Sequence, residues 1–288
     1  MNAVADMNAD VGLVDLDALV SHVGDGALLA LPNAVSTEFS GISMVATRAL
    51  IRKGIKDLEL VAVPSTSLQG DLLIGAGCVA SLLTGSILLY EYGRANRFMD
   101  AQKAGTITIK DSTCPAIHAG LIAAEKGLPF MPLRGLIGSD VLRYRMEYDG
   151  WQCIDNPLAK NDPIVVVPPI RPDVCVLHVP LADRLGNVWI GRRSEFATLA
   201  RASTKTLVTF EKFFDGDLMA NDDKAPATIP ELYVTALSHQ PKGSWPLHCG
   251  KAYAEDAGHM REYAELSKTE AGFAEYLDRY VLDIDEAA

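Results

Sequence analysis

The chain has 288 residues, 49% of them apolar and 22% charged, so it is long enough and apolar enough to bury a large α/β core. Its formal net charge of −11 repels phosphate backbones, which argues against nucleic acid as a partner. No apolar run is long enough for a membrane span, and the acidic N-terminus lacks the basic and then apolar pattern of a secretory signal.

The cysteines are an odd-numbered, scattered set without a C-x-x-C pair. A chain of this size does not need disulfides to hold its fold, so we expect reduced thiols, a cytoplasmic location and no zinc or other metal site. The five residues are Cys78, Cys114, Cys153, Cys175 and Cys249.

The first third of the chain alternates strand and helix. The apolar run Ala27–Pro32, bounded by turn residues, predicts a buried strand. A helix follows, with Ser36 and Thr37 as candidate caps and Gly54 as its end. Leu58–Val63 predicts the next strand. Strand, helix and strand over this distance indicate a crossover unit with parallel strands.

The alternation continues to the C-terminus. We expect Ile164–Val167 and Val174–Val179 in the central sheet because both runs are strongly β-branched or apolar, and we expect Phe214–Thr228 to be an exposed polar loop. The whole pattern predicts an open, mainly parallel sheet with helices on both faces, formed by residues 1–288 as one domain with a helical segment from about residue 253. The other predicted strands or extended segments are Leu72–Ile74, Ser86–Tyr90, Thr106–Ile109, Leu128–Leu133 and Lys205–Phe210, and the other predicted helices are Asp15–His22, Ala116–Lys126 and Ser194–Ala202.

Ligands of open parallel sheets bind at the carboxyl ends of the strands, so candidate site residues should follow strands. Asn33 lies in such a position, where backbone N–H groups of the loop can face an anion or a thioester oxygen, or where the loop can simply cap a helix. Ser65 follows the strand that ends at Val63. Gly75-Ala76-Gly77 either permits a close backbone approach to a ligand or forms an ordinary turn.

Two further segments carry charged residues. Arg134 stands near Gly138 and Ser139 after an extended segment, which favours a clamp for a carboxylate or phosphate over a surface ion pair with Asp140. His178 ends the most apolar strand, and we interpret it as a structural histidine with satisfied hydrogen bonds rather than as a general base.

Several segments match one family in chain order. Gly54–Val61 resembles a G-x-x-D-L-x-L-V passage, Gly75–Val79 a G-A-G-x-V turn, Gly127–Asp140 a G-x-P-F-x-P-x-R…G-[ST]-D stretch, and Pro172–Val188 a P-D-V…H…A-D-x-x-G-N-V stretch. These motifs are similar to those of the α-type subunits of family I coenzyme A transferases, of the glutaconate CoA-transferase type, and of the related CoA hydrolases that open steroid rings. The resemblance covers most of the chain.

The resemblance implies an α-type subunit of a heteromeric acyl-CoA:carboxylate CoA-transferase, with CoA as substrate and no bound cofactor. In that family a glutamate of the β-type chain attacks the thioester, so the resemblance implies a β-type partner in a heterodimer or heterotetramer. Arg134 would bind a substrate carboxylate or a CoA phosphate. Asn33, Ser65 and Gly75–Gly77 would line the acyl pocket, with Gly138 and Ser139 near the arginine.

Two alternatives stay open. The hydrolase relatives use an acidic residue in the loop that here reads Lys110–Pro115 and contains Asp111 but no glutamate. Asp111 would then act on a ring-containing acyl-CoA, unless it is an ordinary loop or cap carboxylate. The second alternative is a non-catalytic chain that binds acyl-CoA or scaffolds a partner, which the absence of a nucleophilic glutamate motif favours.

Overall fold

The computed structural model describes residues 12–33 and 38–282. The helices are α1 (Leu16–Ser21), α2 (Met44–Lys53), α3 (Leu68–Gly75), α4 (Asn96–Ala104), α5 (Cys114–Glu125), α6 (Asp140–Tyr148), α7 (Glu195–Ala202), α8 (Ala257–Leu266) and α9 (Glu270–Leu277). The strands are β1 (Leu28–Pro32), β2 (Leu58–Val63), β3 (Ser65–Thr66), β4 (Val79–Thr84), β5 (Ser86–Ile87), β6 (Thr108–Asp111), β7 (Met131–Leu133), β8 (Gln152–Asp155), β9 (Pro163–Val167), β10 (Val174–Ala182), β11 (Val188–Trp189), β12 (Lys205–Phe213), β13 (Thr228–Ile229) and β14 (Ala236–His239).

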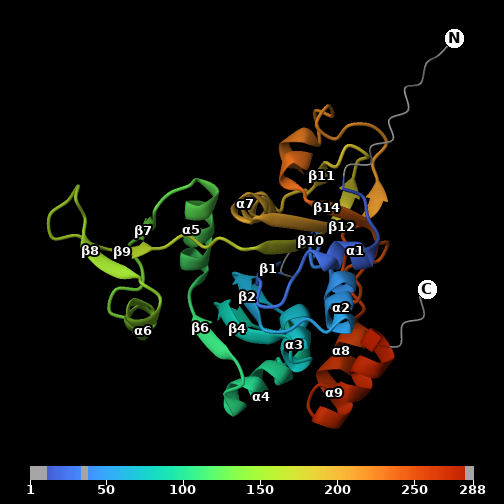
Figure 1. The fold of residues 1–288 in the computed structure, drawn as a ribbon, viewed down its shortest axis with the longest axis horizontal. Coiled ribbons are helices and arrows are strands. Elements are labelled where there is room, and N and C mark those ends of the chain that lie inside the picture. Colours follow the sequence, from blue (N-terminus) through green and yellow to red (C-terminus); the bar gives the residue numbers. More distant parts are fainter. Residues whose placement is uncertain (1–11, 34–37, 283–288) are drawn as a thin grey trace.

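The central sheet is mainly parallel, as predicted. Strands β6, β4, β2, β1, β10, β12 and β14 lie side by side in this order, and every pair among these neighbours is parallel. The short strands β11 and β13 add an antiparallel extension at the carboxyl end of β10. The order places β1 in the interior of the sheet, so the loops after β1 and β10 are neighbours at the carboxyl edge (Figure 1).

Helices cover both faces of this sheet (Figure 1). Along β1, Leu29 and Leu31 pack into one core with α2, α3, α8 and α9, whereas Ala30 packs into a second core with α5 and α7. Successive side chains of a strand point to opposite faces, so a run that is apolar at every position is buried on both. This confirms the fold class expected from the sequence.

Helix α2 ends as the sequence predicts. Gly54 adopts φ of +74°, and its N–H donates to carbonyl groups of the last turn, so the helix ends at Lys53. At the other end, the Ser43 hydroxyl accepts from the N–H of Ala46 at 3.3 Å. The predicted caps Ser36 and Thr37 lie outside the described residues.

Three strand predictions were wrong or displaced. Leu72–Ile74 belongs to helix α3, because an apolar run buried all around fits either a strand or a buried helix. Ser86–Tyr90 divides into the two-residue strand β5 and a helical turn at Tyr90–Tyr92. Ile164–Val167 does form strand β9, but outside the central sheet.

Strands β7, β9 and β8 form a separate antiparallel sheet, which with α6 makes a lobe at the left of Figure 1. Its small core contains Trp151, Val165 and Val167. The β-branched composition of β9 reflects its middle position in this sheet, and composition does not reveal which sheet a strand joins. The lobe lies beside the end of β6, since Asp111 acts electrostatically on Arg145 of α6.

The rest of the chain follows the expected order with one difference. The turn from Asp183 to Asn187 joins β10 to β11, with the Asp183 carboxylate accepting from the N–H of Asn187 at 2.9 Å. The segment Phe214–Thr228 is not wholly exposed, because Leu218 is buried and its N–H donates to Asp183. The C-terminal segment is helical, with Tyr276 of α9 buried.

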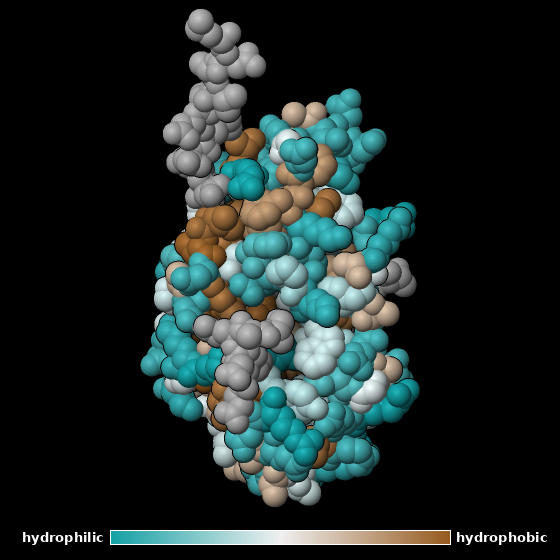
Figure 2. Space-filling model, turned by 90° about the vertical axis from the view of Figure 1, so that its right-hand side faces the viewer, coloured by the Kyte–Doolittle hydropathy of each residue, from teal (hydrophilic) through white to brown (hydrophobic). Residues whose placement is uncertain are grey.

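The face of the molecule shown in Figure 2 is mostly hydrophilic, with apolar residues gathered in its upper half. Among the residues that the structure describes, no helix is both long and apolar enough to cross a lipid bilayer.

Candidate functional site

Polar side chains gather at the carboxyl edge of the central sheet. Asn33 follows β1, Ser65 lies two residues beyond β2, and Asp111 is the last residue of β6. Parallel strands end at one edge, so these three predicted site residues share it. Glu211, near the end of β12, stands at the same edge and was not among the predicted residues.

Tyr90 connects two of these residues. Its hydroxyl donates to Oδ1 of Asn33 at 3.2 Å. Burial raises the pKa of Tyr90, and a hydrogen bond with Ser65 opposes that rise. Tyr90 adopts φ of +52°, a conformation that non-glycine residues rarely adopt and that is enriched at functional sites. The structure therefore brings Asn33 and Ser65 together around a strained tyrosine that sequence reasoning had placed in a strand.

Arg193, next to the start of α7, holds the loop after β1 in place. Its guanidinium donates to the carbonyl oxygens of Asn33 at 2.7 Å, Phe39 at 2.7 Å and Ser40 at 3.0 Å. The side chain is only 4% exposed and lies over the ring of Phe196, 4.3 Å from its centroid. The described ends of the loop are thus fixed on both sides by one planar cation with several donors.

A glycine makes this anchoring possible. Gly41 adopts φ of +72°, and an added Cβ there would collide with the Phe196 ring. Its carbonyl oxygen accepts from the N–H of His178 at 2.9 Å. The loop therefore packs directly against both α7 and β10.

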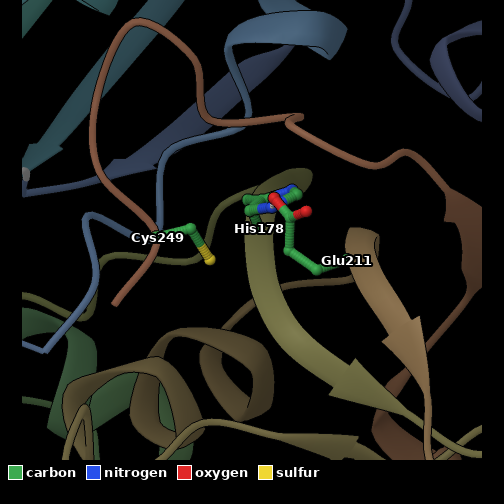
Figure 3. A group of neighbouring side chains, drawn as sticks. All are labelled: His178, Glu211 and Cys249. Carbon is green, nitrogen blue, oxygen red and sulfur yellow. Dashed lines mark hydrogen bonds and ion pairs between the residues drawn. The ribbon is translucent and has the colours of Figure 1, made fainter. Parts of the chain in front are cut away.

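His178 of β10 and Glu211 of β12 are buried and lie side by side (Figure 3), and the half-buried Tyr253 joins them in a hydrogen-bond network. Nε2 of His178 and the Tyr253 hydroxyl bond Oε1 of Glu211 at 2.7 and 2.5 Å, and the N–H of Lys242 donates to Oε2 at 2.8 Å. Nδ1 of His178 bonds the Thr209 hydroxyl at 2.8 Å. Both ring nitrogens of His178 are satisfied, as predicted for a structural histidine.

The network keeps Glu211 ionised. Burial alone would raise the pKa of the Glu211 carboxyl, but hydrogen bonds from His178 and Tyr253 outweigh it, and the pKa lies below its ordinary value. Burial and the Glu211 charge raise the pKa of the nearby Cys249 thiol to about 12. Cys249 is therefore a thiol rather than a reactive thiolate.

His178, Glu211 and Cys249 lie close enough together to be considered as metal ligands. However, Nε2 of His178 and Oε1 of Glu211 are 2.7 Å apart, a hydrogen-bond distance. Two ligands of one tetrahedral zinc ion, each about 2.0–2.2 Å from the metal, are separated by more than about 3 Å. As placed, the pair bonds to each other and does not fit a shared ion.

The predicted turn from Gly75 to Gly77 does not lie at the carboxyl edge of the sheet. Gly75 ends α3, and the chain then passes into the amino end of β4, where Lys56 Nζ donates to the Gly77 carbonyl at 3.4 Å. Gly75 to Gly77 therefore lie at the opposite edge of the sheet from Asn33 and do not line a pocket with it. An added Cβ at Gly75 would lie 2.5 Å from the ring of Phe273, so close helix packing explains this glycine.

The arginine segment lies in the lobe. Arg134 is 69% exposed in its side chain and pairs with Asp162 rather than with Asp140. Gly138 adopts φ of +83°, and the Ser139 hydroxyl caps α6 by accepting from the N–H of Leu142 at 3.2 Å. Ser139 thus has a structural role, whereas Arg134 has a head group that a ligand can reach.

Replacement of Arg134 by methionine is expected to leave the free energy of unfolding nearly unchanged, because exposed ion pairs contribute little. Urea denaturation measures this free energy. Any large fall in turnover by Arg134→Met would then report lost contact with a ligand rather than lost folding. Equal turnover in the variant and the parent chain would remove Arg134 from the site.

A pocket of about 800 Å³ opens beside the buried network. Its size falls in the usual range for small-molecule sites. The lining residues are Glu38, Phe39, Pro180, Leu181, Trp189, Arg192, Arg193, Glu211, Lys212, Cys249, Gly250, Lys251 and Ala252.

Sequence reasoning did not identify Arg193, Tyr90, Glu211 or Tyr253. Glu211 could have been recognised as a candidate site residue from one feature of the sequence, because it is a single acidic residue at the end of an apolar strand. The others come from separate loops, and only the folded chain brings them to the same edge.

A parallel sheet with polar side chains at its carboxyl edge defines an α/β protein that binds a small molecule there. The comparisons with known proteins specify the family. The chain is 30% identical over 272 residues to the A-type subunit of 3-oxoadipate CoA-transferase from Pseudomonas knackmussii, covering 92% of this chain and 91% of that protein. It is 28% identical over 286 residues to the A-type subunit of glutaconate CoA-transferase from Acidaminococcus fermentans, covering 94% of this chain and 87% of that protein.

The solved structure of the Acidaminococcus fermentans glutaconate coenzyme A-transferase superposes with a TM-score of 0.85 at 26% identity, covering 95% of this chain and 90% of that one. The chain is also 27% identical over 246 residues to a cholesterol ring-cleaving hydrolase IpdA subunit of Rhodococcus jostii, covering 83% of this chain and 82% of that protein. It spans 54% of an uncharacterised Archaeoglobus fulgidus protein that is 30% identical over 252 residues. No protein-family model matches. The chain belongs to the family of A-type, or α-type, CoA-transferase subunits.

Proposed function

We propose that this chain is the α-type subunit of a heteromeric acyl-CoA:carboxylate CoA-transferase. The observation that carries the proposal is the internal hydrogen bonding of Glu211. This buried carboxylate at the site edge accepts hydrogen bonds from His178, Tyr253 and the backbone of Lys242, so three of its roughly four acceptor positions are occupied. A carboxylate held in this way is a poor nucleophile toward a thioester.

The attacking carboxylate then comes from a β-type partner chain. It forms an acyl anhydride and releases the CoA thiolate, which then attacks the glutamyl carbonyl, expels the donor acid and leaves an enzyme–CoA thioester. The acceptor carboxylate opens this thioester to a second anhydride, and the CoA thiolate released in that step attacks its acyl carbonyl to give the new acyl-CoA and the free glutamate. This chain supplies polar groups around the thioester. The polar side chains that lie at the edge of β1 and β2 and would surround it are those of Ser65, Tyr90 and Asn33, which are already hydrogen-bonded to one another. Arg134 binds a carboxylate or a CoA phosphate from the side of the lobe.

The test is thioester loss from a panel of acyl-CoAs, with and without a carboxylate acceptor, using this chain co-expressed with a β-type chain. A new acyl-CoA that appears only with acceptor supports the proposal. Mass spectrometry should then find the CoA adduct on the partner. An adduct on this chain, or turnover by this chain alone, contradicts the proposal. Binding of acyl-CoA without turnover in either preparation would make the chain a binding or scaffold protein.

A second candidate function is the hydrolysis of a ring-containing acyl-CoA. Asp111 favours it, because this exposed carboxylate ends β6 at the same edge of the sheet as Ser65. One of the relatives is a ring-cleaving hydrolase subunit. In this reaction Asp111 would accept a proton from the attacking water.

The Asp111→Asn variant separates the two reactions. If the complex is a hydrolase, we expect release of free CoA to fall by about 10²–10⁴-fold, the usual contribution of a general base. If it is a transferase, we expect acceptor-dependent turnover to stay within about threefold, since Asp111 has no proton to move in that reaction. The matched control is Asp140→Asn on the neighbouring helix α6, which should leave both rates unchanged.

We further propose that the complex is a heterodimer or heterotetramer that works in the cytoplasm. The five cysteines are free thiols in the structure, which suits a reducing compartment. Light scattering of the co-purified chains measures the stoichiometry. A monomeric chain that does not associate with any β-type partner would contradict the proposed assembly.

A further inference from the structure

The pocket of about 800 Å³ has not been assigned a ligand by the proposed chemistry, and it carries its own charge pattern. We call it the β10–β12 pocket because the ends of these two strands form one wall. The other walls are formed by the end of the loop after β1, by strand β11, by the residues next to the start of α7 and by the loop from Cys249 to Ala252.

Three cations on the pocket wall have no carboxylate partner among the described residues. Within residues 12–33 and 38–282, no ion pair involves the side chain of Arg192, Lys212 or Lys251, and all three residues are exposed. The fourth lining cation, Arg193, is already occupied by backbone carbonyl groups. The wall therefore carries four cations against the two carboxylates of Glu38 and Glu211, an excess of two positive charges on a chain whose net charge is −11.

The two lining carboxylates offset only part of this charge, and both have internal hydrogen-bond partners. Glu211 is bonded within its buried network, and Oε2 of Glu38 accepts from the backbone N–H of Arg192 at 2.7 Å. Both acidic groups are thus turned toward internal donors. The side chains of Phe39, Leu181 and Trp189 give the pocket an apolar lining as well.

We propose that the β10–β12 pocket binds a small organic anion with an apolar body, and that Arg192, Lys212 and Lys251 hold its acidic group. An arginine with two lysines matches a carboxylate or a phosphate, since arginine can bond such groups in a bidentate way and lysine adds point charges. The apolar lining contacts the rest of the ligand. Arg193 joins this pocket to Asn33, so an occupant borders the loop after β1.

The acidic group can come from a free carboxylic acid or from the phosphates of CoA. Isothermal titration calorimetry of the full-length chain at low salt distinguishes the two sources with benzoate and with 3′-phosphoadenosine 5′-phosphate as probes. We expect saturable binding of one probe with one site per chain. The measurement needs no turnover, so its outcome is independent of the proposed transferase activity.

The decisive variant replaces Arg192, Lys212 and Lys251 together by glutamine. The control variant replaces Arg94, Lys103 and Lys160 by glutamine, which removes the same charges from exposed positions outside the pocket. We expect the pocket variant to raise Kd at least about tenfold and the control to change it less than about twofold.

Two outcomes would overturn the inference. One is the absence of saturable binding for both probes, and the other is an equal rise of Kd in the pocket and control variants, which would indicate attraction to overall charge only. If the triple variant fails to fold, Lys251→Gln alone is tested, because Lys251 is exposed in a loop. It should raise Kd about threefold, and an unchanged Kd would count against the site.

Discussion

Replacement of Glu211 by alanine is expected to lower the free energy of unfolding by about 3–5 kcal/mol, the range for removing one partner of a buried charged network. The change leaves His178 and the Tyr253 hydroxyl buried without their acceptor. Urea denaturation at neutral pH measures the loss. The matched control is Glu265→Ala, since Glu265 is 72% exposed and pairs only with Lys268, and we expect a change below about 0.5 kcal/mol there.

The same network makes a prediction about pH. The pKa of Glu211 in the folded chain lies below its value in the unfolded chain, so the carboxylate stabilises the fold above the unfolded pKa. This contribution is lost as the pH falls through the folded pKa. The difference in stability between the parent chain and Glu211→Gln should therefore be largest near neutral pH and shrink below about pH 4.5. A difference that stays constant from pH 7 to pH 3.5 would show that the network does not depend on the Glu211 charge.

The fold could be predicted from the sequence where local signals were unambiguous. Gly54 marked the end of α2 because few other residues adopt its left-handed conformation easily. The runs Leu58–Val63 and Val174–Val179, each apolar at all but one position, had the composition of strands buried on both faces. The same kind of run gave a wrong strand prediction at Leu72–Ile74, which belongs to helix α3. This helix is buried all around, so its apolar residues show no helical period.

The site was predictable only in part. Asn33 and Ser65 could be placed at one edge, because position after a parallel strand is a property of chain order. Glycine content could not place Gly75 to Gly77, whose small size serves packing against Phe273 at the other edge. Arg193 could not be predicted at all. Its partner Asn33 is 160 residues away in sequence, and no local pattern encodes that contact.

Arg193 therefore provides the most specific test of how the site is built. Replacement by lysine keeps the charge but cannot reproduce the planar set of donors to the carbonyl oxygens of Asn33, Phe39 and Ser40, and it loses the stacking on Phe196. We expect kcat/KM of the complex with the β-type chain to fall by about 10²-fold, the size of effect that follows a misplacement of about 1 Å at a reacting centre. The free energy of unfolding should fall by about 1–3 kcal/mol from the carbonyl groups left unpaired.

The effect on turnover can be separated from the effect on stability, because turnover can be measured under conditions where the variant is folded. Turnover is measured at a temperature where denaturation shows the Arg193→Lys chain to be fully folded, so a lower kcat then reflects a displaced loop rather than unfolded protein. Arg201→Lys is the matched control, since Arg201 lies on α7, stacks over Tyr233 and is 38% exposed. It should leave kcat/KM unchanged. If Arg193→Lys also keeps the parent rate, the loop after β1 does not position the reacting groups, and Asn33 would leave the candidate site with it. A rate lost only in Arg193→Lys would show that Arg193, which precedes α7 and was not a predicted site residue, sets the geometry at the end of β1.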